Sequence, residues 1–235
     1  NFAMENIQQT VNGTAANSGR VSVTIARNGD LVGNMYLALT PNLYAYTNLT
    51  SNNNVFDANW IAERAVAAVE LTIGGQRIDK HYQTWFRLYA ECFLGESDKI
   101  AYGKMTSASA LAVTNSTARV YLPLLFFFNR NPGLFLPLIA LQYHEVRLDF
   151  DTTAYYTSYF GTTNAFEVWG NYIYLDTEER RRFAQKGHEY LIEQLQFTGG
   201  ESVTSSANKI KMNFNHPTKE LVWVVQRDSF VSCDD

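Results

Sequence analysis

Apolar and polar residues alternate with a period of two in several segments, which is typical of β-strands with one buried face. The clearest segment runs from Val21 to Ile25, and Asn28-Gly29-Asp30 then predicts a hairpin turn into a strand over residues 31–39. Another alternating segment over residues 69–73 ends at Gly74-Gly75, where a tight turn favours residues without a Cβ. Further strands are expected over residues 119–128, 136–150, 167–175, 190–197, 209–214 and 221–225.

The most apolar part of the chain, residues 122–144, consists of two apolar runs on either side of Asn131-Pro132-Gly133. Pro fixes φ for an early turn position and Gly accepts a positive φ after it, so these three residues predict a tight turn. We expect two buried strands joined there. Because both arms are apolar, they must be covered on both faces by the domain itself or sealed by another molecule.

Two segments have helical rather than strand periodicity. Aromatic residues fall at the three-and-four spacing of one helix face between Tyr82 and Phe93, after Asp79 as a candidate N-cap. A short helix is expected over residues 177–183, with Asp176 as N-cap and acidic residues in its first turn. Polar loops are expected over residues 40–59, 105–118, 151–165 and 199–208.

Many short strands, long polar loops and few helices favour an all-β fold, a sandwich with jelly-roll or Greek-key topology and short helices in its loops. The composition limits the function. Charged residues are 18% of the chain and the net charge is −4. The sequence therefore lacks the basic stripe that direct nucleic-acid binding requires. Cys92 and Cys233 lie too far apart in sequence for a disulfide framework or a CxxC site, which fits a reducing compartment. The sequence has no signal peptide and no apolar run of transmembrane length.

Catalytic and metal-binding patterns are absent from the sequence. The four histidines, His81, His144, His188 and His216, are isolated, without the His-x-His pair of metal-binding cupins or an HExxH motif. His144 precedes the alternating Val146, Leu148 and Phe150, so we expect a hydrogen-bonded histidine at a core edge. Nucleotide-binding and nucleophile-elbow motifs are also missing. The sequence therefore predicts no enzyme activity and no cofactor.

Two sets of surface residues remain as candidate sites. Asn12, Asn48 and Asn115 begin Asn-x-Thr tripeptides, although chance alone predicts about three such matches in a chain of this composition. Arg180, Arg181 and Arg182 follow Glu178-Glu179, which indicates a solvated helix face or an inter-subunit ion-pair patch.

Several long blocks resemble the major capsid proteins of large icosahedral double-stranded DNA viruses, in particular those of the algal phycodnaviruses. Two of the most distinctive are Pro137-Leu-Ile-Ala-Leu-Gln-Tyr-His-Glu-Val146 and Phe214-Asn-His-Pro-Thr218. The remaining blocks are residues 1–13, 27–31, 69–82, 131–133, 183–185 and 188–196. Together they extend over nearly the whole chain.

The resemblance implies two consecutive eight-stranded jelly rolls per chain and a homotrimer that forms a pseudo-hexagonal capsomer. Neighbouring capsomers and minor capsid proteins would be the partners, in an icosahedral shell that is assembled in the host cytoplasm over an internal viral membrane. On this basis residues 1–198 are expected to form the first jelly roll, without its N-terminal arm and opening strand. Residues 199–235 would be a linker and the start of a truncated second jelly roll.

The resemblance also gives a role to the turn at Asn131, Pro132 and Gly133, which becomes a candidate assembly contact together with the three arginines. A carbohydrate-binding jelly-roll module is the alternative from another class, since lectins share the architecture. Against it, the 14 tyrosines and 4 tryptophans are spread along the predicted strands. A cupin-type metal enzyme is a third hypothesis, which the missing histidine pair disfavours.

Overall fold

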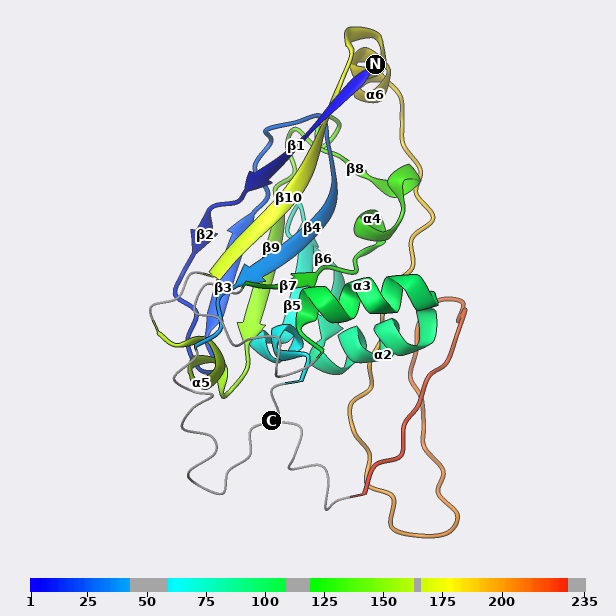
Figure 1. Cartoon of the computed structure of the whole chain (residues 1–235). Helices are drawn as coiled ribbons and strands as arrows, with labels where there is room; N and C mark the ends of the chain where they lie inside the picture. Colours follow the sequence, from blue (N-terminus) through cyan, green and yellow to red (C-terminus); the bar gives the residue numbers. More distant parts are fainter. Residues whose placement is uncertain (43–58, 109–118, 163–165, 228–235) are drawn as a thin grey trace. The chain divides into compact units, whose positions relative to one another are not determined.

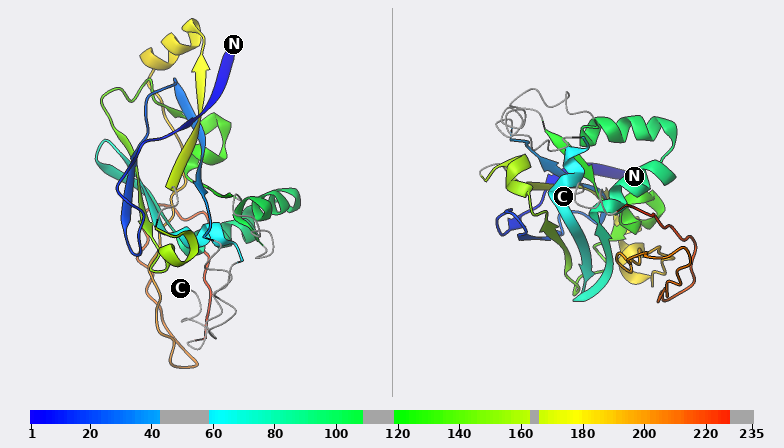
Figure 2. Two further views of the ribbon diagram at one scale, coloured as in Figure 1. Left: turned by 60° about the vertical axis from the view of Figure 1, so that its left-hand side comes forward. Right: turned by 90° about the horizontal axis from the view of Figure 1, so that it is seen from below.

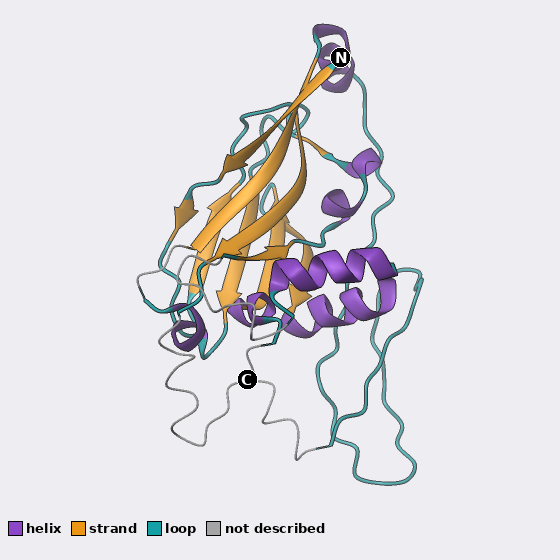
Figure 3. Cartoon of the chain, in the orientation of Figure 1, coloured by secondary structure: helices purple, strands orange, loops and turns teal. Residues whose placement is uncertain are grey.

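The computed structural model describes residues 1–42, 59–108, 119–162 and 166–227. The chain divides into two compact units, Asn1–Gln194 and Leu195–Asp235. The first unit is a sandwich of two antiparallel sheets (Figures 1 and 3). The predicted boundary between residues 198 and 199 stays a prediction.

The first sheet has the order β1-β10-β4-β7, and the short strand β8 also pairs with β4. Its strands are β1 (Phe2–Gln8), β10 (Phe166–Leu175), β4 (Leu31–Leu39), β7 (Val120–Pro123) and β8 (Leu136–Pro137). The second sheet has the order β2-β3-β9-β5-β6. Its strands are β2 (Val11–Asn12), β3 (Arg20–Thr24), β9 (Val146–Thr152), β5 (Val66–Ile73) and β6 (Gln76–Tyr82).

The pairing order is that of a jelly roll, which confirms the expected fold class. The first strand pairs with the last, β1 with β10, while β3 pairs with β9 in the opposite sheet. Without the two-residue strands β2 and β8, each sheet contributes four strands to the eight of a jelly roll. The expectation that the opening strand is missing is therefore wrong, because β1 occupies that place.

The core lies between the sheets and is filled by the inward residues of the alternating strands. Val21 and Val23 of β3 are fully buried and face the core beside Leu148 and Phe150 of β9. The first sheet contributes Leu37 from β4 and Val168 from β10. Period-two alternation therefore identified the buried faces of β3 and β9 correctly.

The alternation did not identify which strands pair. Asn28-Gly29-Asp30 does not close a hairpin, since β3 belongs to the second sheet and β4 to the first. This connection instead carries the chain from one sheet to the other. By contrast, Gly74 and Gly75 do join β5 to β6 in a hairpin, with φ values of 57° and 80° that favour glycine.

The hairpin predicted around Asn131-Pro132-Gly133 is wrong. Strand β7 ends at Pro123, and the chain then forms the short helix α4 (Phe127–Arg130) and the 3₁₀ turn η3 (Pro132–Leu134). Strands β7 and β8 both pair with β4 and not with each other. Asn129 stabilises the helical turn, because its buried amide accepts from Phe126 N and donates to the Gly33 carbonyl at 2.8 Å.

The predicted helices are present with small changes. Helix α2 (Gln83–Phe93) has Tyr82 as its N-cap, whereas Asp79 lies in β6. Helix α6 (Thr177–Gln185) starts as expected, with Asp176 Oδ1 accepting from Glu179 N at 3.1 Å. Elements that the sequence pattern did not predict include η1 (Ile61–Ala65), α3 (Glu96–Thr106) and α5 (Tyr156–Phe160).

The second unit has neither helix nor strand in its described residues, 195–227. The strands expected over residues 209–214 and 221–225 are therefore not formed, and neither is the strand over residues 190–197. A strand needs a neighbour for its backbone groups, and the described part of this unit provides none.

Candidate assembly surfaces

The outward face of the first sheet carries aromatic side chains. Trp169 on β10 is directly opposite Tyr36 on β4, and the Tyr36 ring contacts that of Tyr121 on β7 at a centroid distance of 5.8 Å. Asn6 and Gln8 of β1 add amide groups to this aromatic face, and Asn6 Nδ2 lies 2.5 Å from the Tyr36 hydroxyl. Aromatic residues are enriched in protein–protein interfaces, so this face has the composition of one.

The outward face of the second sheet is ionic. Arg20 on β3 lies 3.4 Å from Asp149 on β9 and 3.6 Å from Asp151. Lys80 on β6 lies 3.9 Å from Glu70 and 3.8 Å from Asp151. Opposite charges on neighbouring strands stabilise a sheet and also compensate one another. This ionic face therefore has few uncompensated charges to attract a charged partner.

Asp149 lies at the centre of the ionic face, and its side chain is only 2% exposed. Burial acts to raise its pKa, but the hydroxyl of Ser22 and the guanidinium groups of Arg147 and Arg20 outweigh burial and lower the pKa. Arg147 Nε donates to Asp149 Oδ2 at 3.0 Å. The carboxylate is held ionised by its neighbours within the sheet.

The three residues of the predicted turn, Asn131, Pro132 and Gly133, lie exposed at a corner of the first unit. Asn131 is the N-cap of η3, and its Oδ1 accepts from Gly133 N at 2.9 Å. Pro132 occupies the first position of η3, where its missing N–H is not needed. The cap and the proline hold the shape of the turn, and its three residues are exposed.

The three arginines of α6 have different environments. Arg180 donates to Asp30 Oδ1 at 2.7 Å and so holds α6 to the sandwich. Arg181 forms an ion pair with Glu178 within the helix. Arg182 is exposed and has no ion pair with another described residue. Within the described part of the chain no hydrogen bond or ion pair joins these arginines to Asn131, so the structure does not connect the two candidate sets.

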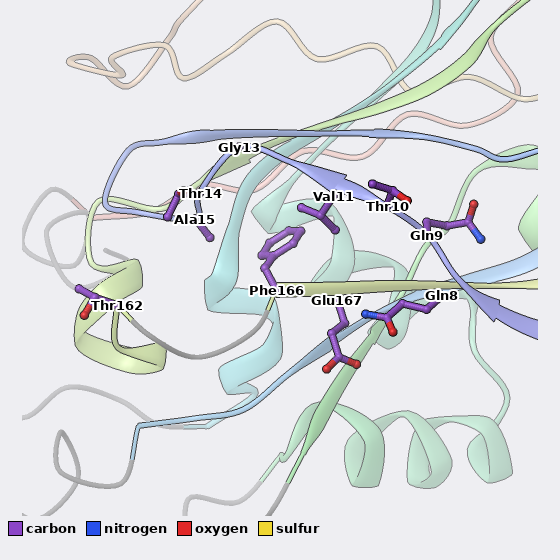
Figure 4. A pocket seen from close by; sticks show the side chains of 10 residues that line it. All are labelled: Gln8, Gln9, Thr10, Val11, Gly13, Thr14, Ala15, Thr162, Phe166 and Glu167. Carbon is purple, nitrogen blue, oxygen red and sulfur yellow. The ribbon is translucent and has the colours of Figure 1, made fainter.

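Of the three Asn-x-Thr asparagines, Asn12 is exposed on the two-residue strand β2. Asn48 and Asn115 lie outside the described residues. Val11 and Gly13, the neighbours of Asn12, line a shallow open hollow of about 650 Å³ (Figure 4). Its other lining residues are Gln8, Gln9, Thr10, Thr14, Ala15, Thr162, Phe166 and Glu167.

Two of the polar side chains that line the hollow, Gln9 and Glu167, are engaged within the protein. Gln9 Oε1 accepts from Ala26 N at 3.0 Å and from the Tyr172 hydroxyl at 2.8 Å. Glu167 pairs with Arg119 at 2.9 Å and accepts from Trp169 Nε1 at the same distance. Nothing in this arrangement provides an activated nucleophile.

The histidines lie apart, as the sequence indicated. His81 is buried on β6, where its Nε2 lies 2.9 Å from Asp79 Oδ2 and its ring stacks on Phe126 at 4.5 Å. His144 is exposed before β9, so the expected core-edge position is wrong. In the described ranges no three His, Cys, Asp or Glu side chains are grouped to hold a metal ion. Nor does any described helix have the length and hydrophobicity that a membrane span requires.

The fold and these faces place the chain in the class of jelly-roll sandwiches, and comparisons with known proteins then place it in a family. The family model described as "Major capsid protein N-terminus" matches residues 1–176. The model described as "Large eukaryotic DNA virus major capsid protein" matches residues 179–235. The chain therefore belongs to the major capsid protein family of large eukaryotic DNA viruses.

Individual relatives agree with this assignment. The chain is 46% identical to the major capsid protein of Paramecium bursaria Chlorella virus 1, over 95% of this chain and 52% of the relative. It is also 46% identical to that of Pyramimonas orientalis virus, over 95% of this chain and 56% of the relative. In the quasi-atomic model of the PBCV-1 virus capsid, one chain is similar with a TM-score of 0.77 and 44% identity, over 93% of this chain and 55% of that chain. The chain thus spans about half the length of these relatives.

Proposed function

We propose that this chain is part of a structural subunit that self-assembles into trimeric, pseudo-hexagonal capsomers of an icosahedral virion shell. The observation that carries the proposal is the match of two capsid family models, one after the other, along residues 1–176 and 179–235. In this proposal residues 1–198 are the first jelly roll. Residues 199–235 are the linker and the beginning of a second one.

A shell subunit works through its surfaces and has no catalytic task. The aromatic face around Tyr36, Tyr121 and Trp169 supports this role. Its rings have large contact areas that a second copy of the chain can bury. Its ion pair, Arg119 with Glu167, leaves little uncompensated charge. The ionic face is less suited to a tight contact, because its charges would lose water on burial.

The partners in this proposal are further copies of the chain in the trimer, neighbouring capsomers and minor capsid proteins. The mature location is the virion capsid, above an internal viral membrane, after assembly in the host cytoplasm. With a net charge of −4, the subunit is not expected to contact the genome directly. Asn131, Pro132, Gly133 and Arg182 are the proposed contacts between subunits, because all four are exposed and Arg182, unlike Arg180 and Arg181, has no ion pair with another described residue.

A carbohydrate-binding module is not favoured as the alternative, since the relatives are named as capsid proteins. Glycans attached to Asn12, Asn48 or Asn115 are a separate proposal. Intact-mass measurement of protein purified from virions tests it, and a mass without added hexose would refute it.

The main test measures the mass in solution of the full-length natural protein by light scattering. We expect a trimer, and labelled antibodies should decorate the outside of purified virions. A monomer that binds sugars and is missing from virions would refute the proposal.

A charge substitution tests the proposed contact at Arg182. Arg182→Gln should weaken the contacts between subunits, because it removes an exposed positive charge from α6. Arg181→Gln is the matched control, since the Arg181 guanidinium already pairs with Glu178 inside the helix. Equal trimer stability on dilution in both variants would remove Arg182 from the proposed contacts.

A further inference from the structure

Helices α2 and α3 are attached to the sandwich at one side and are not a layer of it. They lie side by side and extend away from the two sheets (Figure 2). The buried residues of the two helices are Phe86, Ala90, Tyr102 and Thr106. Segments with few buried side chains open at a lower free energy than central strands do. The helices are therefore suited to open as a unit.

A buried carboxyl group lies where the two helices meet the sandwich. Glu63 belongs to η1, and its side chain is only 7% exposed. The Tyr102 hydroxyl of α3 donates to Glu63 Oε1 at 2.7 Å. Arg87 of α2 has its NH1 3.8 Å from the same oxygen, which is too long for a hydrogen bond. Glu63 therefore contacts both helices, and we call Glu63, Arg87 and Tyr102 the clasp.

Arg87 has other partners besides Glu63. Its guanidinium carbon lies 4.2 Å from the centre of the Trp60 ring and 5.6 Å from the centre of the Tyr102 ring. Its NH2 lies 3.5 Å from Glu91 Oε1. Aromatic rings and a second carboxylate stabilise a guanidinium group. The positive charge of Arg87 therefore keeps partners when Glu63 is neutral.

The ionised clasp is poorly solvated in the closed structure. Arg87 Nε and NH1 are buried and have no hydrogen-bond acceptor among the described residues. Burial raises the pKa of Glu63, and Glu91 adds to this effect, while Tyr102, Arg87 and Arg64 oppose it. A buried pair whose charges share no hydrogen bond recovers little of the hydration that both groups lose.

We infer that the clasp is a pH-sensitive conformational device: α2 and α3 open from η1 more readily when Glu63 is ionised, and close more firmly when it is protonated. On opening, the ionised carboxylate regains water. A protonated carboxyl in the closed structure still accepts from Tyr102 and carries no charge into the interior. This device lies within the first unit and goes beyond the proposed shell function.

The direction of the pH effect follows from proton linkage. The closed structure holds the proton of Glu63 more tightly than the open one, because its carboxyl has the higher pKa. The added stability of the closed helices is fully present below the pKa of the open, solvated carboxyl. It is lost as the pH rises through the closed-state pKa.

Hydrogen exchange of the full-length natural protein, read by mass spectrometry of its peptides, tests the clasp. The intrinsic exchange rate at each pH, divided by the measured rate of the α2 and α3 peptides, gives their protection. Glu63→Gln cannot ionise and retains an acceptor for Tyr102. We expect the ratio of protection in the unsubstituted protein to that in Glu63→Gln to fall several-fold between about pH 4.5 and about pH 8.

The ratio removes effects of other titratable groups near the helices. His81 of β6 is one, with its ring centre 6.1 Å from that of Trp85 on α2. Lys99 of α3 is another, 3.8 Å from Glu91. Glu91→Gln is the matched control, since Glu91 also pairs with Arg87 but is 57% exposed. Its helices should keep the pH dependence of the unsubstituted protein.

Peptides from β3 and β9 monitor the sandwich. They should be protected more strongly than the helices at every pH, and equal protection would overturn the inference, because the helices would then open only with the whole protein. A ratio that does not change with pH would also overturn it, as would loss of the pH dependence in Glu91→Gln.

Tyr102→Phe gives an independent measurement that does not need Glu63→Gln to fold. The variant lacks the hydroxyl that donates to the ionised carboxylate, so Glu63 should hold its proton still more tightly in the closed structure. We expect the protection of α2 and α3 to fall more steeply with pH than in the unsubstituted protein. An equal or smaller fall would contradict the role of the clasp.

Discussion

Arg180 Nε donates a hydrogen bond of 2.7 Å to Asp30 Oδ1, across 150 residues of sequence. The Asp30 side chain is only 4% exposed, and its other oxygen accepts from Leu175 N at 2.8 Å. Asp30 precedes β4, Leu175 ends β10, and Arg180 belongs to α6. This contact therefore fixes the helix to the end of the first sheet where β4 begins and β10 ends.

Removal of Arg180 should destabilise the protein. Arg180→Ala leaves the buried Asp30 carboxylate with only the Leu175 N–H, so we expect a loss of about 1–3 kcal/mol in the free energy of unfolding. Chemical denaturation measures it. Arg181→Ala is the control, since it removes only an exposed pair with Glu178 and should cost less than about 0.5 kcal/mol. Equal losses in the two variants would contradict this role of Arg180.

A side chain at Gly33 on β4 would meet the ring of Phe135. An added Cβ would lie 2.6 Å from two ring atoms of Phe135, so we expect Gly33→Ala to cost about 1–3 kcal/mol through overpacking. Gly187→Ala is the control, because nothing lies within 4 Å of its Cβ position, and it should be close to neutral. The double variant Gly33→Ala with Phe135→Leu should recover part of the loss if the clash is the cause.

The stability provided by Asp149 should depend on pH. Folding lowers the pKa of this carboxyl, so its contribution is present above the pKa of the unfolded chain and is lost as the pH falls through the folded-state pKa. We expect Asp149→Asn to be less stable than the unsubstituted protein at pH 7. The difference should shrink toward about pH 3, below the ordinary pKa of aspartate.

The control for this experiment is Asp151→Asn, on the same strand. Its carboxylate is 34% exposed and pairs with Arg20 and Lys80 at 3.6 and 3.8 Å. Such partly exposed pairs contribute little, so the loss at pH 7 should stay below about 1 kcal/mol. An Asp149→Asn variant with a pH-independent loss would contradict the assignment.

Glu63 should have the opposite pH dependence. Burial raises its pKa, against the opposing effects of the Tyr102 hydroxyl and of Arg87 and Arg64. The Tyr102 hydroxyl donates to Glu63 Oε1 at 2.7 Å, and burial also raises the pKa of Tyr102, which keeps this donor protonated. A carboxyl with a raised folded-state pKa costs stability when it is ionised, and this cost disappears as the pH falls through that pKa.

We therefore expect the unsubstituted protein to gain stability relative to Glu63→Gln as the pH is lowered from 7 to about 4.5. Denaturation curves at several pH values measure the difference. Tyr102→Phe removes the hydroxyl donor that opposes the rise in the pKa of Glu63. Between pH 7 and about 4.5 this variant should therefore gain more stability than the unsubstituted protein does. A Glu63→Gln variant that becomes relatively more stable on acidification would contradict the raised pKa.

The sequence predicted much of the fold from local patterns. Alternation identified β3, β5 and β9 with their buried faces, and aromatic spacing identified α2. The start of α6 followed from Asp176, since an N-cap needs only the amide groups of its own first turn. By contrast, α3 was missed because its apolar residues follow no helical stripe, so no local signal was available.

The candidate site was less predictable from local patterns. Sequence alone does not distinguish Arg180, Arg181 and Arg182. The tertiary structure pairs Arg180 with Asp30 and leaves Arg182 exposed, without an ion pair among the described residues. The aromatic face was missed as a unit, because Tyr36, Tyr121 and Trp169 lie on three strands that are distant in sequence.

The sequence by itself determined the all-β class, the buried side of the strands that alternate clearly (β3, β5 and β9) and, through long blocks, the resemblance to capsid proteins. Only the tertiary structure decided which strands pair. Alternation specifies one buried face, and backbone hydrogen bonds are the same for any neighbour, so the partner depends on how the whole core packs. The apolar stretch before Asn131 illustrates this. Its residues are as buried as predicted, but a buried amide at Asn129 and packing under β4 make part of it helical.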